Sequence, residues 1–90
     1  MPVLIQVTLG AGATQISKHG INFKQMIIQN NTSADTVRVG DSTVSSTKGI
    51  LLTAGSAFNA GALNIQAGIL SGYYLFGTAA DVIDVLYEPA

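Results

Sequence analysis

The feature that most constrains this chain is a two-residue alternation of apolar side chains, interrupted at short intervals by turn residues. The first segment shows it clearly: Val3, Ile5, Val7 and Leu9 fall on one side of an extended chain, and Leu4, Gln6 and Thr8 on the other. Alternation of this period is typical of strands with one face on a core. No longer window carries the apolar stripe of an α-helix. The sequence therefore predicts an all-β protein.

Clusters of Gly, Ser, Thr, Asn and Asp divide the chain into about eight short strands. The predicted strands are Val3–Leu9, Thr14–Ser17, Phe23–Gln29, Thr36–Val39, Ile50–Leu52, Ala57–Ala60, Tyr73–Phe76 and Val82–Glu88. A single helical turn is expected near Ala67 to Leu70, and no substantial helix. Many short strands predict a small β-sandwich, jelly-roll-like in its connections. Residues 1–90 form one domain in this interpretation, with 1–9 as its first strand or as an extended arm.

Alternation also predicts which side chains share a face. In the third strand it sets Phe23, Gln25, Ile27 and Gln29 against Lys24, Met26, Ile28 and Asn30. In the strand 73–76 it sets Tyr73 and Leu75 against Tyr74 and Phe76, so one pair should enter the core. Since both faces of that strand are apolar, we expect it to be central in its sheet or covered by another subunit.

The composition is poor in charge, which narrows the classes of partner. Charged residues make up 10% of the chain and the net charge is −1, so the clustered Lys and Arg that nucleic acids and anionic membranes require are missing. The chain has no cysteine, which excludes disulfides. We expect stability to come from packing or from partner subunits. The N-terminus has no secretory pattern and no apolar run is long enough for a bilayer, so we expect synthesis in the cytoplasm.

Residues that could carry chemistry are few. His19 is the only histidine and has no acidic neighbour in sequence, so we interpret it as a surface residue of a turn. The triplet 40–42, Gly-Asp-Ser, is typical of a turn in which the side chains bind their own backbone. A Gly-x-Gly at 10–12 lacks the helix that a dinucleotide site requires. We predict no catalytic residue, no metal site and no cofactor.

Asp84 is the odd polar side chain on the mainly apolar face that it shares with Val82 and Leu86. If buried, it would need a partner such as Arg38 or Lys24; at an edge or interface it would be solvated. We take it as part of a candidate interface. The candidate interface residues are Val3, Leu4, Ile5, Val7, Ile69, Leu70, Tyr73 and Asp84.

From Asn31 to Glu88 the order of turn and strand residues resembles a known group of proteins. The segments concerned are 31–35 (NTSAD), 37–40 (VRVG), 42–52 (STVSSTKGILL), 54–56 (AGS), 74–82 (YLFGTAADV) and 85–88 (VLYE). This order is similar to small β-sandwich proteins encoded among the virion genes of tailed bacteriophages, some of them capsid decoration or cement proteins. The resemblance covers roughly two-thirds of the chain. It implies a non-enzymatic β-sandwich subunit, often a homotrimer, that is located on the capsid surface of a virion and contacts the major capsid protein or other virion proteins.

Two further interpretations stay open. The first is a receptor- or glycan-binding module of a tail or head fibre, which would need a polar, aromatic-lined concavity formed by the loops 30–35 and 42–49. The second is a head–tail connector subunit, which would assemble into a ring of more than three copies.

Overall fold

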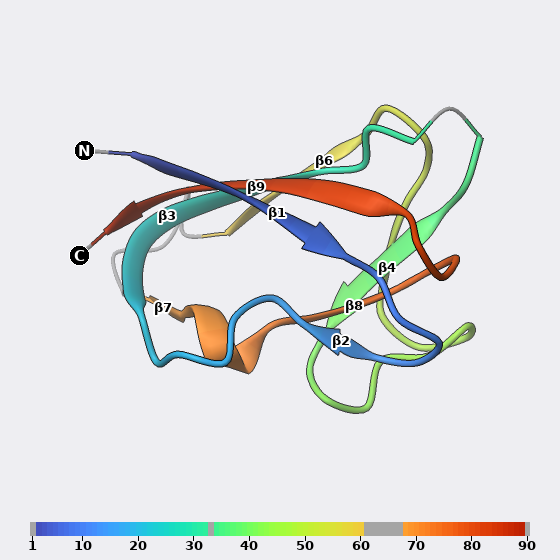
Figure 1. Ribbon diagram of the computed structural model, residues 1–90, viewed down its shortest axis with the longest axis horizontal. Coiled ribbons are helices and arrows are strands. Elements are labelled where there is room, and N and C mark those ends of the chain that lie inside the picture. The colour runs from blue at the N-terminus through green and yellow to red at the C-terminus, as the bar shows by residue number, and fades with distance from the viewer. Residues whose placement is uncertain (1, 33, 61–67, 90) are drawn as a thin grey trace.

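The computed structural model describes residues 2–32, 34–60 and 68–89, and it shows two antiparallel sheets packed face to face (Figure 1). The larger sheet has the order β1 (Val3–Thr8), β9 (Val82–Pro89), β3 (Asn22–Gln29) and β6 (Ala57–Ala60), with β7 (Gly68–Ile69) paired to the start of β3. The smaller sheet has the order β2 (Thr14–Gln15), β8 (Tyr74–Phe76), β4 (Val37–Gly40) and β5 (Ile50–Leu52). The predicted all-β sandwich is confirmed.

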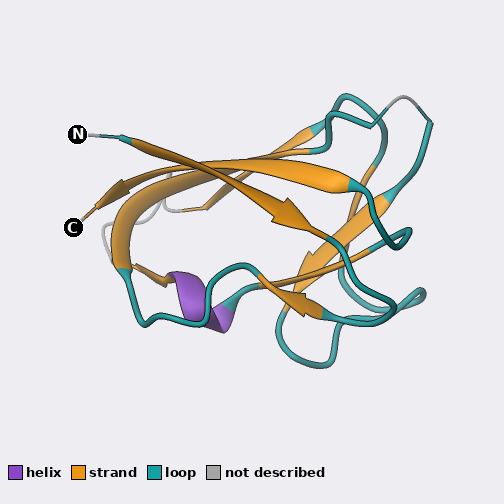
Figure 2. Ribbon diagram, in the orientation of Figure 1, coloured by secondary structure: helices purple, strands orange, loops and turns teal. Residues whose placement is uncertain are grey.

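The connections follow a jelly roll once the two-residue β7 is set aside. The chain passes repeatedly from one sheet to the other, so neighbouring strands come from distant parts of the sequence. Within the described ranges the helical content is one 3₁₀ turn, η1 (Leu70–Gly72), visible in Figure 2. The helical turn expected near Ala67 to Leu70 therefore begins at Leu70, and Ala67 lies outside the described residues.

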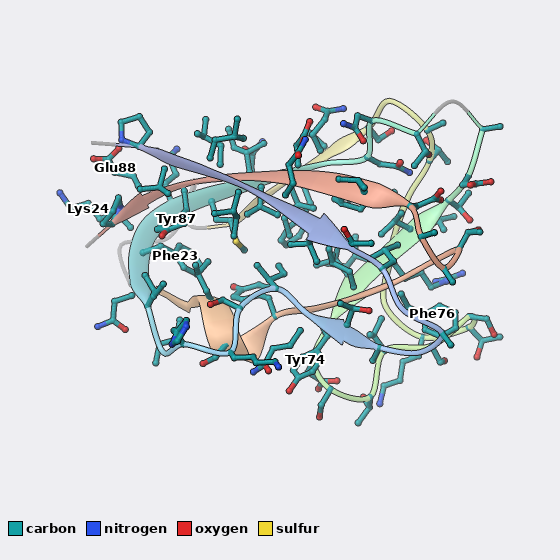
Figure 3. The ribbon with its side chains drawn as sticks, viewed as in Figure 1. Phe23, Lys24, Tyr74, Phe76, Tyr87 and Glu88 are labelled. Atoms are coloured by element: carbon teal, nitrogen blue, oxygen red, sulfur yellow. The ribbon has the colours of Figure 1, made fainter. Side chains whose placement is uncertain are left out.

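The core fills the space between the two sheets. Phe23 and Tyr87 lie between the layers in Figure 3, and Leu75 of β8 is fully buried. Tyr73 packs on the same core, with its ring centroid 5.6 Å from that of Phe23. β8 lies between β2 and β4, as its two apolar faces predicted. The other buried apolar residues are Val7, Leu9, Ile16, Met26, Ile28, Val37, Val39, Val44, Leu52, Leu70, Ile83 and Val85.

The predicted faces of β3 were wrong at its start. Phe23 is buried, but so are Met26 and Ile28, which strict alternation placed on the opposite side. The cause is a bulge, because the register with β9 shifts between Phe23 and Gln25. An extra residue in one strand reverses the side to which later side chains point.

Asn30 lies at the end of β3 and is fully buried, although the sequence placed it at the start of a polar loop. Its Nδ2 donates hydrogen bonds to the backbone oxygens of Asp35 and Leu52, each at 2.9 Å. Its Oδ1 accepts from the backbone N–H of Thr32 at 3.2 Å and from the Thr32 hydroxyl at 2.6 Å. The side chain thus holds the 30–35 loop against the end of β5, on the other sheet.

Candidate functional site

The outer face of the larger sheet, turned away from the smaller sheet, carries a continuous row of apolar side chains. The strand register places Leu4 of β1 opposite Leu86 of β9, and Leu86 opposite Ile27 of β3. Leu4 is 64% exposed and Leu86 40%, while Ile27 is half-buried. We call these three residues the apolar row. Val82 of β9 adds a further exposed apolar side chain on the same face.

The next row of the same face is polar, and its side chains form hydrogen bonds with one another or with the backbone of a neighbouring loop. The register aligns Gln6, Asp84 and Gln29 across β1, β9 and β3. Gln6 Nε2 donates to Asp84 Oδ1 at 3.0 Å, and Gln29 Nε2 donates to the Gly55 oxygen at 2.9 Å. Asn31 Nδ2 donates to Asp84 Oδ2 at 2.7 Å. Asp84 therefore has amide partners in place of the Arg38 or Lys24 that the sequence suggested.

A shallow hollow of about 100 Å³ lies beside the apolar row, toward the end of the sheet at which β1 begins and β9 ends (Figure 1). Ile27 and Leu86 line it, and Pro2 and Glu88 form part of its rim. Figure 3 shows Lys24 and Glu88 at this same end of the molecule. The face thus combines a flat apolar row with a small depression at its edge.

The structure divides the remaining candidate interface residues between inside and outside. Leu70 is fully buried in the core, and Val7 of the edge strand β1 packs on the same core with 7% of its surface exposed. Val3, Ile5 and Tyr73 are half-buried and pack against the core. Ile69, on β7, is 48% exposed. Of the predicted set, Leu4 and Asp84 lie together on the outer face and Ile69 lies apart from them.

A second hollow, of about 250 Å³, lies on the smaller sheet. The register places Phe76 of β8 opposite Arg38 of β4. Arg38 and Phe76 line the hollow with three hydroxyl side chains, from Thr36, Ser46 and Thr78. Arg38 Nη1 donates to the Gly49 oxygen at 2.9 Å, which fixes the guanidinium. Sequence reasoning named the 30–35 and 42–49 loops for such a concavity but not Arg38, which the pairing of β4 with β8 brings next to Phe76.

Asp81 faces a second carboxyl. Its Oδ2 is enclosed and has no hydrogen-bond partner in the described structure. A hydrogen bond shared with the Asp35 carboxyl raises the pKa of Asp81, and burial and the charge of Asp35 act in the same direction. Two carboxyl groups can share a hydrogen bond only when one of them carries a proton. The raised pKa of Asp81 places the turn before β9 beside the Asp35 carboxyl.

His19 and Asp41 lie in ordinary turns. His19 is exposed, as predicted. Asp41 Oδ1 accepts the Thr43 backbone N–H at 2.9 Å, and the Thr43 hydroxyl and N–H lower the pKa of Asp41. Over the described ranges there is no group of three His, Cys, Asp or Glu side chains that could hold a metal ion. Helices long and apolar enough to cross a membrane are likewise missing from this part of the chain.

The comparisons with known proteins give no family for this chain: no family model matches it, and no curated protein matches it.

Proposed function

We propose that this chain is a non-enzymatic structural subunit of a tailed-phage virion, a decoration or cement protein that binds neighbouring capsid subunits through the outer face of its larger sheet. The observation that carries the proposal is the apolar row Leu4–Leu86–Ile27 on a face with little charge. The resemblance of residues 31–88 to such virion proteins gives the biological setting. The jelly roll is compatible with it, since many capsid domains have this fold.

The chemistry of the outer face suits contact with protein. Its polar row is already hydrogen-bonded within the chain, through Gln6, Asp84 and Gln29. A partner that covers the face therefore leaves few polar groups without bonds, and the gain from burying the apolar row is retained. The three side chains of the apolar row carry no charge, which matches the cores of protein interfaces, since these are depleted in charged residues.

The mechanism is mechanical. Each copy buries its outer face where capsid subunits meet, and copies joined to one another bind together with higher avidity than one alone. Later contacts form at high effective concentration, so a weak contact per subunit becomes a stable bridge. The particle is stabilised because separating its subunits requires the release of several such contacts at once.

Rebinding of the purified protein to stripped phage heads tests the proposal, with Leu86→Gln as the probe. Leu86 exposes 40% of its surface. Burial of the roughly 70 Å² that this represents, at about 25 cal/mol/Å², is worth about 2 kcal/mol, or a factor of roughly thirty in Kd. Leu51→Gln is the matched control, because Leu51 is 48% exposed but lies on the smaller sheet. Equal binding by both variants, or no binding by the wild type, would contradict the proposal.

A second candidate function, a glycan-binding fibre module, is favoured by the hollow at Arg38 and Phe76. An aromatic side chain beside a fixed guanidinium and several hydroxyls is a surface on which a sugar ring could stack and form hydrogen bonds. Titration with a panel of neutral and acidic oligosaccharides, followed by amide NMR, tests this candidate. Saturable shifts confined to residues 36–38, 46 and 76–78 would support it, and unchanged spectra across the panel would exclude those sugars as ligands.

A further inference from the structure

β1 is an unusual edge strand. Among the edge strands of the described ranges, β2, β5 and β6 have two, three and four residues, whereas β1 has six. The sequence of β1, VLIQVT, contains no charged residue and no proline, and its register with β9 runs without a bulge. Charge, proline, bulges and shortness are the devices by which monomeric proteins block pairing between exposed edges. β1 has none of them.

The backbone groups on the open side of β1 can be assigned. The Leu9 N–H donates to the Asp81 oxygen and the Leu9 oxygen accepts from the Ala80 N–H, both at 2.8 Å. The backbone of Leu9 therefore faces β9. In an antiparallel strand the backbone groups of successive residues point alternately to one side and the other. The N–H and C=O groups of Leu4, Gln6 and Thr8 therefore face away from β9, on the open side.

The inner side of the same edge is incompletely covered. Val3 and Ile5 point toward the core and pack on it, yet both remain half-buried. On the outer side, Leu4 is the most exposed of the large apolar residues in the described structure, at 64%. Hydrogen-bonding groups and apolar surface are thus left open along one strand.

We propose that two copies of this chain pair antiparallel through β1, with Gln6 opposite Gln6 of the second copy. This inference deepens the proposed function, on which it rests for its biological role. The register sets Leu4 opposite Thr8 on the outer face. The backbone N–H and C=O groups of Leu4, Gln6 and Thr8 in the two copies then form about six hydrogen bonds across the pair. On the inner face, Ile5 lies opposite Val7 and Val3 lies opposite Leu9 of the second copy.

The second copy is the partner because the strand complements itself. Each inner pair in this register is apolar, and the strand contributes no like charges to oppose it. A net charge of −1 per chain adds little repulsion between copies. The pairing joins the two outer faces into one continuous surface, so the apolar rows of both copies meet a partner together. It yields a dimer, whereas the resemblance implies a trimer.

Sedimentation velocity on the full chain, from about 1 to 200 µM, tests the pairing, because this range covers dimers with a standard binding free energy of roughly −5 to −8 kcal/mol. We expect a monomer–dimer equilibrium that Gln6→Lys weakens about tenfold or more, since it sets two ammonium groups opposite each other. Gln25→Lys is the matched control: it adds the same charge at an exposed position of the same sheet, but on the central strand β3. The control should dimerise like the wild type.

Thr8→Pro provides a second test, because it removes an N–H that faces the open side and none that binds β9. It should remain folded by circular dichroism and fail to dimerise. Hydrogen exchange should show the Gln6 and Thr8 amides protected at high concentration and unprotected after dilution. A monomer at about 200 µM, a trimer, or equal effects of Gln6→Lys and Gln25→Lys would overturn the pairing. A monomer that still binds heads would overturn the pairing alone, and a dimer that does not bind heads would overturn the proposed function alone.

Discussion

Asn30→Asp is a sharp test of how this small sandwich is held together, because it exchanges one NH₂ group for an oxygen and leaves the shape nearly unchanged. In the wild type, Asn30 Nδ2 donates to the backbone oxygens of Asp35 and Leu52, each at 2.9 Å. The variant loses both hydrogen bonds and sets a carboxylate oxygen against two carbonyl oxygens. The bonds that Thr32 donates to the other side-chain oxygen are retained.

The expected loss is large for a chain of this size. A lost hydrogen bond to a buried polar group costs about 1–3 kcal/mol, so the loss of both gives roughly 2–6 kcal/mol. At about 0.05–0.15 kcal/mol per residue the whole domain has roughly 5–13 kcal/mol of stability. Burial raises the pKa of the new carboxyl, and its protonated form regains one donor. The loss should therefore shrink as pH falls through the raised pKa.

Urea denaturation followed by far-UV circular dichroism at about pH 7 and pH 4.5 measures both effects. Asn22→Asp makes the same chemical change at an exposed position of the same strand and should cost less than about 1 kcal/mol. If the free energy of unfolding of Asn30→Asp lies within about 1 kcal/mol of that of Asn22→Asp at neutral pH, the Asn30 side chain does not join the two sheets as described.

Three other predictions concern stability. Asp81→Asn should remove a pH dependence of the folding stability, because Asp35 raises the pKa of Asp81 in the folded state. The stability contributed by protonation of Asp81 is present at low pH and is lost as pH rises through that pKa. The difference in Tm between variant and wild type should therefore narrow or reverse between about pH 7 and pH 4.5. Gly49→Ala should lower the free energy of unfolding, measured by urea denaturation, by about 2–3 kcal/mol, because Gly49 has φ 130° and the added Cβ would lie 2.7 Å from a methyl group of Val44. Gly12→Ala, with nothing within 4 Å of the added Cβ, should be nearly neutral. Leu75→Ala, at a fully buried position of the central strand of the smaller sheet, should cost about 3–4 kcal/mol in the same assay, and a cost below about 1 kcal/mol would contradict its place in the core.

The strands could be predicted from the sequence because alternation is a local signal. β1, β5 and β6 begin at the predicted residues. Gly, Ser and Thr flank β5 and β6 on both sides, and Pro2 precedes β1. The two-residue β7 was missed because a strand of that length carries no period. Tyr74 and Phe76 were correctly separated from Leu75, because a short strand without a bulge keeps its phase.

Properties that depend on pairing between distant residues could not be predicted. The bulge in β3 lies opposite β9, some sixty residues away in sequence, and nothing local marks it. Asp84 is bound by Gln6 and Asn31, which come from other strands and loops. Ile27 was not named for the candidate interface, although Leu4 and Asp84 were, for the same reason. The apolar row forms only once β1, β9 and β3 are aligned.

A cryo-EM map of phage heads carrying this protein would show whether the outer face of the larger sheet is an adhesive surface. Density for the protein should lie on the capsid, with Leu4, Ile27 and Leu86 turned toward the capsid subunits and the hollow at Arg38 turned away. Density on the tail, or capsid contacts made by the smaller sheet with the apolar row facing solvent, would contradict it.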